Sequence, residues 1–147
     1  MTLGDVPVDD DERLARMILT EKHVRKDIRT GKLTLTPLAF LPFSRVELSV
    51  IRHRAITETE LWDIGREVSA MREASDQFGR KFPLLGRGDF LARDARAVKL
   101  DVRPVEGAEF PRNHADVVGW PPEKPAQMMR AVELAARAIF VPPPNIP

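Results

Sequence analysis

The apolar residues that follow the acidic start of the chain recur at the spacing of an amphipathic helix. Leu14, Met17 and Ile18 fall on one side of a helical projection. Three consecutive aspartates, at positions 9 to 11, come just before them, and aspartate is a common N-terminal helix cap. The pattern therefore predicts a first helix that begins near these aspartates and ends before Gly31.

Alternation of apolar and polar residues, which is typical of half-buried strands, recurs in four later stretches. It predicts strands within residues 46–54, 100–104 and 114–120. It also predicts an edge strand or an extended segment within 33–42, where two prolines interrupt the alternation.

A second helix is predicted within residues 56–74 by the residues at its start. Thr57 and Glu60 stand three apart, as a capping box requires. Ile56 and Leu61 are placed to form a hydrophobic staple around that box. This start is the most completely specified element boundary in the sequence.

The remaining sequence predicts a loop and two further helices. The stretch DQFGRKFPLLGRGDF, residues 76–90, has the glycines of a loop, and its Gly86-x-Gly88 and Arg87-Gly88-Asp89 patterns are too short to indicate a function. A short helix follows, and a last helix begins at two consecutive prolines, 121 and 122. We expect the core-facing side of the last helix to hold Met129, Val132, Ala136 and Ile139.

The order of these elements predicts an α+β fold. We expect a single domain over residues 1–147, with three or four mixed β-strands covered by about four helices. The ends, about 1–9 and 141–147, are expected to be flexible.

The composition excludes several classes of function. The 147 residues include no cysteine, so disulfides, thiolate nucleophiles and cysteine zinc sites are excluded. A formal net charge of +1 gives the chain no overall attraction to a polyanion such as DNA. No apolar run approaches the roughly 18 residues of a membrane span, and the acidic N-terminus is unlike a signal peptide. We therefore expect a soluble, cytoplasmic protein.

His114 and Asp116 are the first candidate site residues. They lie two apart in a predicted strand, so both side chains leave the same face. They could share a metal ion, but two ligands do not complete a site and the other histidines, His23 and His53, have no second ligand close in sequence. We therefore expect no metal and no cofactor. The plainer interpretation places the pair at the exposed entrance of a strand.

Acid–base chemistry without a metal is the second candidate. Arg52, His53 and Arg54 end another predicted strand, and arginines beside a histidine suit a phosphate or acyl substrate. If the two strands were neighbours, an arginine would hold an anion, His114 would transfer a proton and Asp116 would orient His114. Otherwise the arginines are solvated ends of a strand, which is the interpretation we favour.

The segment from Lys22 to Lys32 is rich in cations, among them Arg25, Lys26 and Arg29. Such a segment could contact a nucleic-acid backbone. It has no interleaved aromatic residues for base stacking, and the acidic residues at 9–12 offer its cations a partner within the chain. We therefore expect a solvated helix end, with nucleic-acid binding as the less favoured alternative.

Trp120 closes a predicted strand ahead of two prolines, and the chain ends in the polyproline-like sequence VPPPNIP. A tryptophan edge and an extended tail suit docking to a protein partner or self-association. No complete catalytic set is visible in the sequence. We therefore expect a small accessory or interaction protein rather than an enzyme; a small metal-independent enzyme and a nucleic-acid adaptor are the alternatives.

Several segments resemble a group of uncharacterised short bacterial proteins. LAFLPF followed by LSVIRHR, the ELWDIG helix, and NHADVVGWPPEKPAQMMRAVELAARA are similar to segments of the form LSVxR and HAxxxGWP in that group. The resemblance spans roughly residues 14 to 138. It implies a bacterial origin and one compact domain, and it implies no activity or catalytic residue.

Overall fold

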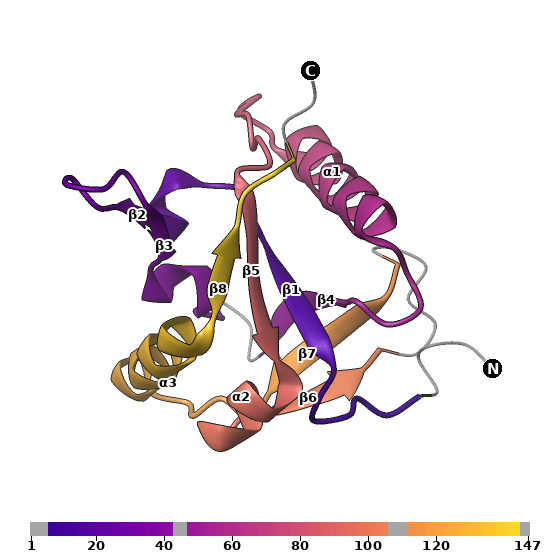
Figure 1. The fold of residues 1–147 in the computed structure, drawn as a ribbon, viewed down its shortest axis with the longest axis vertical. Helices are drawn as coiled ribbons and strands as arrows, with labels where there is room; N and C mark the ends of the chain where they lie inside the picture. The colour runs from indigo at the N-terminus through magenta and orange to yellow at the C-terminus, as the bar shows by residue number, and fades with distance from the viewer. Residues whose placement is uncertain (1–5, 43–46, 106–111, 145–147) are drawn as a thin grey trace.

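The computed structural model describes residues 6–42, 47–105 and 112–144 (Figure 1). Within them lie eight strands: β1 (Arg13–Ile18), β2 (Val24–Lys26), β3 (Leu33–Leu35), β4 (Leu48–Arg52), β5 (Gly86–Leu91), β6 (Asp101–Pro104), β7 (His114–Val118) and β8 (Ile139–Val141). The helices are α1 (Glu58–Ser75), α2 (Ala92–Ala97) and α3 (Lys124–Arg137), with two short 3-10 turns, η2 (Glu21–His23) and η3 (Pro37–Phe40).

Six strands form one antiparallel sheet in the order β6-β7-β4-β1-β5-β8. β1 lies at its centre, where Leu14 pairs with Arg52 of β4 on one side and with Phe90 of β5 on the other. β2 and β3 pair with each other as a separate antiparallel hairpin that projects from the side of the molecule (Figure 1). We call this hairpin, residues 24–35, the arm.

Helix α1 covers one face of the sheet. The predicted capping box at its start is confirmed: Glu60 N donates to Thr57 Oγ1 at 3.1 Å, and Thr57 N donates to Glu60 Oε1 at 3.3 Å. Reciprocal capping satisfies two backbone donors that the first turn would otherwise leave free. Under the helix lies a small apolar cluster of Ala15, Met17, Ile51, Leu61 and Ile64.

Helices α2 and α3 and the turn η3 cover the opposite face, which holds the larger core. At its centre the rings of Phe40 and Phe90 meet edge to face, with centroids 5.7 Å apart. An edge-to-face pair adds a favourable quadrupole interaction to the burial of both rings. Around the pair are packed Leu14, Ile18, Val50, Val117, Trp120 and Leu134.

The predicted first helix is wrong, because Arg13–Ile18 forms the central strand β1. Helices cover both faces of the sheet, so Leu14 and Ile18 are buried on one face while Ala15 and Met17 are buried on the other. A strand that is buried on both faces loses the apolar–polar alternation. Its apolar positions then happen to match helical spacing.

The predicted α+β class is confirmed, while its details change. The described chain has a six-stranded antiparallel sheet, a separate two-stranded sheet and three α-helices, in place of three or four mixed strands with about four helices. The strands predicted within 46–54, 100–104 and 114–120 are β4, β6 and β7. None of the described helices has both the length and the apolar content to cross a membrane.

The end of the predicted loop over 76–90 is in fact strand β5, which pairs with β1 along its whole length. Its glycines are required by packing rather than by a turn. A Cβ on Gly88 would lie 3.0 Å from Leu35 Cδ1 and 3.1 Å from Phe40 Cζ, so a larger residue would fit only if these side chains shifted.

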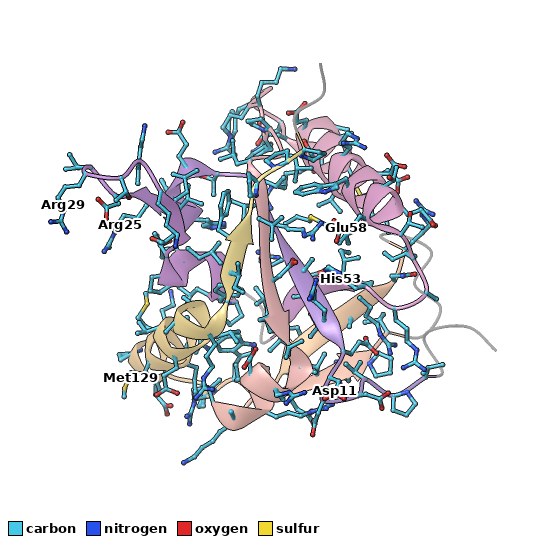
Figure 2. All side chains as sticks on the ribbon, viewed as in Figure 1. Asp11, Arg25, Arg29, His53, Glu58 and Met129 are labelled. Atoms are coloured by element: carbon cyan, nitrogen blue, oxygen red, sulfur yellow. The ribbon has the colours of Figure 1, made fainter. Side chains whose placement is uncertain are left out.

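The core-facing side predicted for the last helix is also wrong. Four residues expected in the core are exposed: Met129, Val132, Ala136 and, in β8, Ile139. The buried side of α3 carries Gln127, Ala131 and Leu134. Figure 2 shows Met129 on the outside of the helix. Alanines lie on both sides of α3, so its periodicity alone did not identify the buried one.

Candidate functional site

His114 and Asp116 share one face of β7, as their spacing predicted. His114 Nε2 lies 3.0 Å from Asp116 Oδ1 and 2.7 Å from the hydroxyl oxygen of Ser49, which is on the neighbouring strand β4. Both side chains of the pair are mostly buried, with 18% and 12% exposed. The three residues form a polar cluster within the sheet rather than a solvated strand entrance.

This cluster lacks the geometry of a serine–histidine–aspartate triad. In a triad the carboxylate holds one ring nitrogen and the serine hydroxyl bonds to the other. Here Ser49 and Asp116 both contact Nε2 of His114, so one nitrogen cannot be held by the acid and also accept the serine proton. Burial raises the pKa of Asp116; nearby His114 lowers it, and Glu47 raises it further. The cluster is best described as a buried polar network.

The arginine predicted to hold an anion beside His114 points elsewhere. Ile51 pairs with His114, so the side chain of the next residue, Arg52, leaves the opposite face of the sheet. There Arg52 is fully buried and bonds to both carboxylate oxygens of Glu12, at 2.5 and 2.7 Å. Val6 O accepts another of its N–H groups at 2.9 Å. These bonds make Arg52 an anchor for the N-terminal segment.

His53 points toward β5, into a buried group of charges under the start of α1. Its Nε2 lies 3.6 Å from Asp89 Oδ1, and Asp89 accepts from Arg87 Nε at 3.0 Å. Arg87 also donates to both oxygens of Glu58, at 2.8 and 2.9 Å, and stacks on Trp62. Figure 2 shows His53 and Glu58 near each other.

Arg87 is the centre of this group. Burial alone would lower the pKa of Arg87, but its hydrogen bonds to Glu58 and Asp89 raise it. The bond from Arg87 holds the pKa of Glu58 below its ordinary value. Paired in this way, the charges of the Arg87-Gly88-Asp89 stretch stabilise the attachment of α1 to the sheet.

Arg54 lies apart from both groups. Its guanidinium is 41% exposed and contacts Asp9 at 3.3 Å and Glu12 at 3.5 Å. The residues 52 to 54 therefore point in three directions, and none of their side chains reaches His114. The structure does not bring the predicted catalytic residues into one site.

The predicted binding residue Trp120 is 7% exposed, and its Nε1 donates to Val117 O at 3.0 Å. It packs in the core and forms no exposed edge. The other predicted binding residues, Arg25, Lys26 and Arg29, lie on the exposed arm. Self-association and a protein partner remain predictions.

A cavity of about 850 Å³ opens between β1, β4 and the second half of α1. Part of its wall is apolar and is formed by Met17, Ile51, Val68, Met71 and Phe82. The cations and the histidine that line it are Arg16, Lys22, His23, Arg72 and Arg80. Its volume is in the range of sites for small organic ligands, about 300 to 1,000 Å³.

The cavity exists because β1 and β4 separate partway along their length. They pair at residues 14 and 15 of β1. At the next residue the side chain of Arg16, instead of the backbone, bonds to the neighbouring segments. Its Nη1 donates to Ser49 O at 3.0 Å, and its Nε donates to Ala39 O at 3.1 Å. The guanidinium therefore satisfies carbonyls that the separated strands leave open, and it is fixed at the cavity wall.

The cavity is strongly electropositive. None of the described residues that line it is an aspartate or a glutamate, and Arg16 forms no ion pair with a described carboxylate. Arg80, by contrast, is bound to Asp76 at 2.7 Å. Burial and then the Arg72 cation lower the pKa of Arg16 to about 10, so it stays charged at neutral pH. A bound anion would relieve this uncompensated positive charge.

The same cations also affect the pKa of His23. Burial, and then Arg16 and Arg72, lower the pKa of His23 from 6.5 to about 4. Between pH 4 and pH 6.5 the imidazole of His23 is therefore mostly protonated in the unfolded chain and mostly neutral in the folded chain. The free energy of unfolding should therefore fall as the pH falls, and His23 alone should account for a loss of about 2 kcal/mol between pH 7 and pH 5.

Urea denaturation of the wild type and of His23→Gln at both pH values tests this expectation. The difference in stability between pH 7 and pH 5 should be smaller in the variant by about 2 kcal/mol. Comparing each protein with itself removes any cost of the substitution that does not depend on pH. An unchanged pH dependence in His23→Gln would contradict the assignment.

No pattern in the sequence indicated this cavity. Arg16 lies within the stretch that was predicted to be helical, where it falls between apolar residues as an ordinary surface residue would. A half-buried arginine that forms no ion pair with a described carboxylate is recognised only when its surroundings are known. Within the described residues no three His, Asp or Glu side chains gather closely enough to hold a metal ion.

Comparisons of the chain with protein-family models, with curated proteins and with solved structures found no match. The resemblance to short bacterial proteins therefore stays an expectation. The function has to be inferred from the side chains of the cavity.

Proposed function

We propose that the protein is a non-catalytic binding protein whose cavity takes a small amphipathic anion. One observation carries the proposal: Arg16 is a charged guanidinium held in a largely apolar cavity with no described carboxylate to balance it. A buried charge without a partner is costly, and a ligand that supplies the opposite charge gains correspondingly.

Arg16 is also suitably oriented to bind such a ligand. Its described hydrogen bonds to Ala39 O and Ser49 O occupy two of its five N–H donors, which leaves three for a ligand head group. Guanidinium groups bind carboxylates through two parallel N–H bonds. The apolar wall beside Arg16 then favours a carboxylate that carries a hydrocarbon body.

Among the described residues that line the cavity, none belongs to a nucleophile–base pair directed into it, which supports binding without catalysis. Ser49 is the described member of the polar cluster that also lines the cavity. Its hydroxyl is engaged with His114 Nε2, and that nitrogen is shared with Asp116. A serine activated as in a triad would need its own ring nitrogen, with the carboxylate on the other one.

Titration calorimetry with octanoate tests the proposal. We expect octanoate to bind, and we expect inorganic phosphate, which lacks the apolar body, and 1-octanol, which lacks the charge, to bind at least tenfold more weakly. The variant Arg16→Met should weaken octanoate binding by about ten- to a hundredfold, the range for loss of one charge-assisted hydrogen-bonded pair. If wild-type protein does not bind octanoate, the proposal is wrong.

A second variant covers the case in which Arg16→Met disturbs the fold. Met71 is 51% exposed at the cavity, so Met71→Glu can place a carboxylate there without loss of core packing. It should weaken octanoate binding by repulsion and by neutralising the cations. Arg66→Gln, an exposed change on the same helix outside the cavity lining, should leave binding unchanged.

A further inference from the structure

The arm formed by β2 and β3 carries a concentration of positive charge. Its exposed cations are Arg25, Lys26, Arg29 and Lys32, and its one carboxylate is Asp27. The arm therefore has a surplus of three positive charges, while the whole chain has a formal net charge of +1. Figure 2 shows Arg25 and Arg29 at the outer part of the arm, directed away from the rest of the molecule.

The acidic residues at 9–12, which the sequence suggested as partners for these cations, form ion pairs with other residues in the structure. Each acid of the run at 9–12 contacts an arginine elsewhere: Asp9 with Arg54, Asp10 with Arg96, Asp11 with Arg93 and Glu12 with Arg52. Figure 2 shows Asp11 near α2, on the other side of the picture from the arm. No described carboxylate forms an ion pair with the four cations of the arm.

Asp27 forms no described ion pair with these cations, because its carboxylate accepts backbone hydrogen bonds at the tip. Asp27 Oδ1 accepts the backbone N–H groups of Arg29 at 2.8 Å and Thr30 at 3.3 Å. Gly31, at φ +73°, closes the turn by donating to Asp27 O at 2.8 Å. A left-handed backbone at this position suits glycine. The tip is thus a hydrogen-bonded turn that holds its cations in place.

The stem of the arm is fixed to the body of the protein. Thr36 N donates to His23 O at 2.9 Å, and Thr36 Oγ1 donates to Lys22 O at 2.7 Å. Leu35 and Val24, which pair across the two strands, pack against the main core. The arm is therefore a supported projection, and its outer half is exposed on all sides.

Ile28 lies at the end of this projection and is 98% exposed. A fully exposed isoleucine, here between Asp27 and Arg29, gains nothing within the folded chain. Apolar side chains at such positions can insert between base steps when a protein binds the minor groove of DNA. The cations on either side of Ile28, Arg25 and Lys26 on β2 and Arg29 and Lys32 in the turn, can at the same time reach the phosphate rows that flank the groove.

We propose that the arm binds duplex DNA without base specificity, with its four cations on the phosphates and Ile28 directed into the minor groove. This proposal is independent of the proposed binding of an anion in the cavity. An anionic membrane surface fits less well, because a single isoleucine offers much less apolar area than the apolar face of an interfacial helix.

Fluorescence anisotropy with a 20-base-pair duplex at several salt concentrations tests the proposal. Four phosphate contacts give a slope of about −3.6 in a plot of log affinity against log salt, which is a loss of about a hundredfold between 50 and 200 mM. In the double variant Arg25→Gln/Arg29→Gln the slope should fall to about −1.8. Binding that is absent at 50 mM salt would overturn the proposal.

A matched control separates local from overall charge. Arg66→Gln/Arg93→Gln removes two exposed arginines from α1 and α2 and changes the net charge equally. This control should keep the wild-type slope; a slope that falls as far as in the arm variant would overturn the proposal. Ile28→Ala should weaken duplex binding about fivefold at an unchanged slope, since it removes the apolar contact alone. If Ile28→Ala bound the duplex as tightly as the wild type, the proposed insertion of Ile28 into the minor groove would be wrong.

Two other ligands complete the experiment. Single-stranded DNA of the same length should bind more weakly than the duplex, because the groove would be absent and the arm has no aromatic side chain for stacking. Vesicles containing phosphatidylserine should bind more weakly than the duplex at the same salt concentration. Tighter binding to either ligand than to the duplex would overturn the assignment.

Discussion

Glu12→Gln is expected to lower the free energy of unfolding by about 3 to 5 kcal/mol, the usual cost of removing one partner from a buried ion pair. Arg52 is fully buried and the Glu12 side chain is 6% exposed, so water cannot replace the lost charge. Glutamine keeps the size of the side chain, which confines the change to its charge and hydrogen bonding. Urea denaturation at pH 7 measures the effect.

Two comparisons identify the cause of that loss. Asp9→Asn removes an exposed partner of Arg54 and should cost less than about 1 kcal/mol, as surface ion pairs do. Combining Glu12→Leu with Arg52→Met replaces the whole pair by apolar side chains and should recover part of the loss. A Glu12→Gln variant as stable as Asp9→Asn would mean that the pair does not anchor the N-terminal segment.

Gly86→Ala is expected to cost about 3 kcal/mol, through backbone strain and overpacking together. Gly86 has a φ of +151°, a conformation that L side chains rarely adopt. A Cβ there would also lie 2.6 Å from ring carbons of Phe140 and 2.8 Å from Val141 O. The strand β8 would have to move away, and thermal and urea denaturation would show the loss.

Gly88→Ala is the matched control on the same strand. Its Cβ would meet the end of the Leu35 side chain at 3.0 Å and the Phe40 ring at 3.1 Å, and a leucine side chain can shift. We expect a cost of about 1 kcal/mol, at the low end for added volume in a packed core. If Gly88→Ala were the more damaging change, the special role of Gly86 beside β8 would be refuted.

Elements that depend on local signals could be predicted from the sequence, and elements that depend on tertiary burial could not. The capping box of Thr57 and Glu60 marks the start of α1 within a few residues, because both partners are local. The strand β1 was mistaken for a helix because its burial on both faces depends on the rest of the fold. The buried side of α3 was predicted wrongly for a similar reason.

The same distinction between local signals and tertiary structure applies to the candidate sites. Residues two apart in a strand lie on the same face, and His114 and Asp116 are in contact in the structure. The direction of Arg52 depends on which face of the sheet Glu12 occupies, and no local pattern specifies that. The cavity at Arg16 arises from the separation of two strands that are far apart in sequence. Such a feature becomes visible only with the strand order.

The arm divides into a stem that the fold requires and a tip that it does not. Val24 and Leu35 belong to the packing of the core, whereas Ile28 and its neighbours at the tip contribute almost nothing to stability. Substitutions and insertions at such a tip are tolerated because no buried contact is lost. Stability therefore places little constraint on the sequence of the tip, and in protein engineering the tip offers a site for grafting short recognition loops onto an unchanged scaffold.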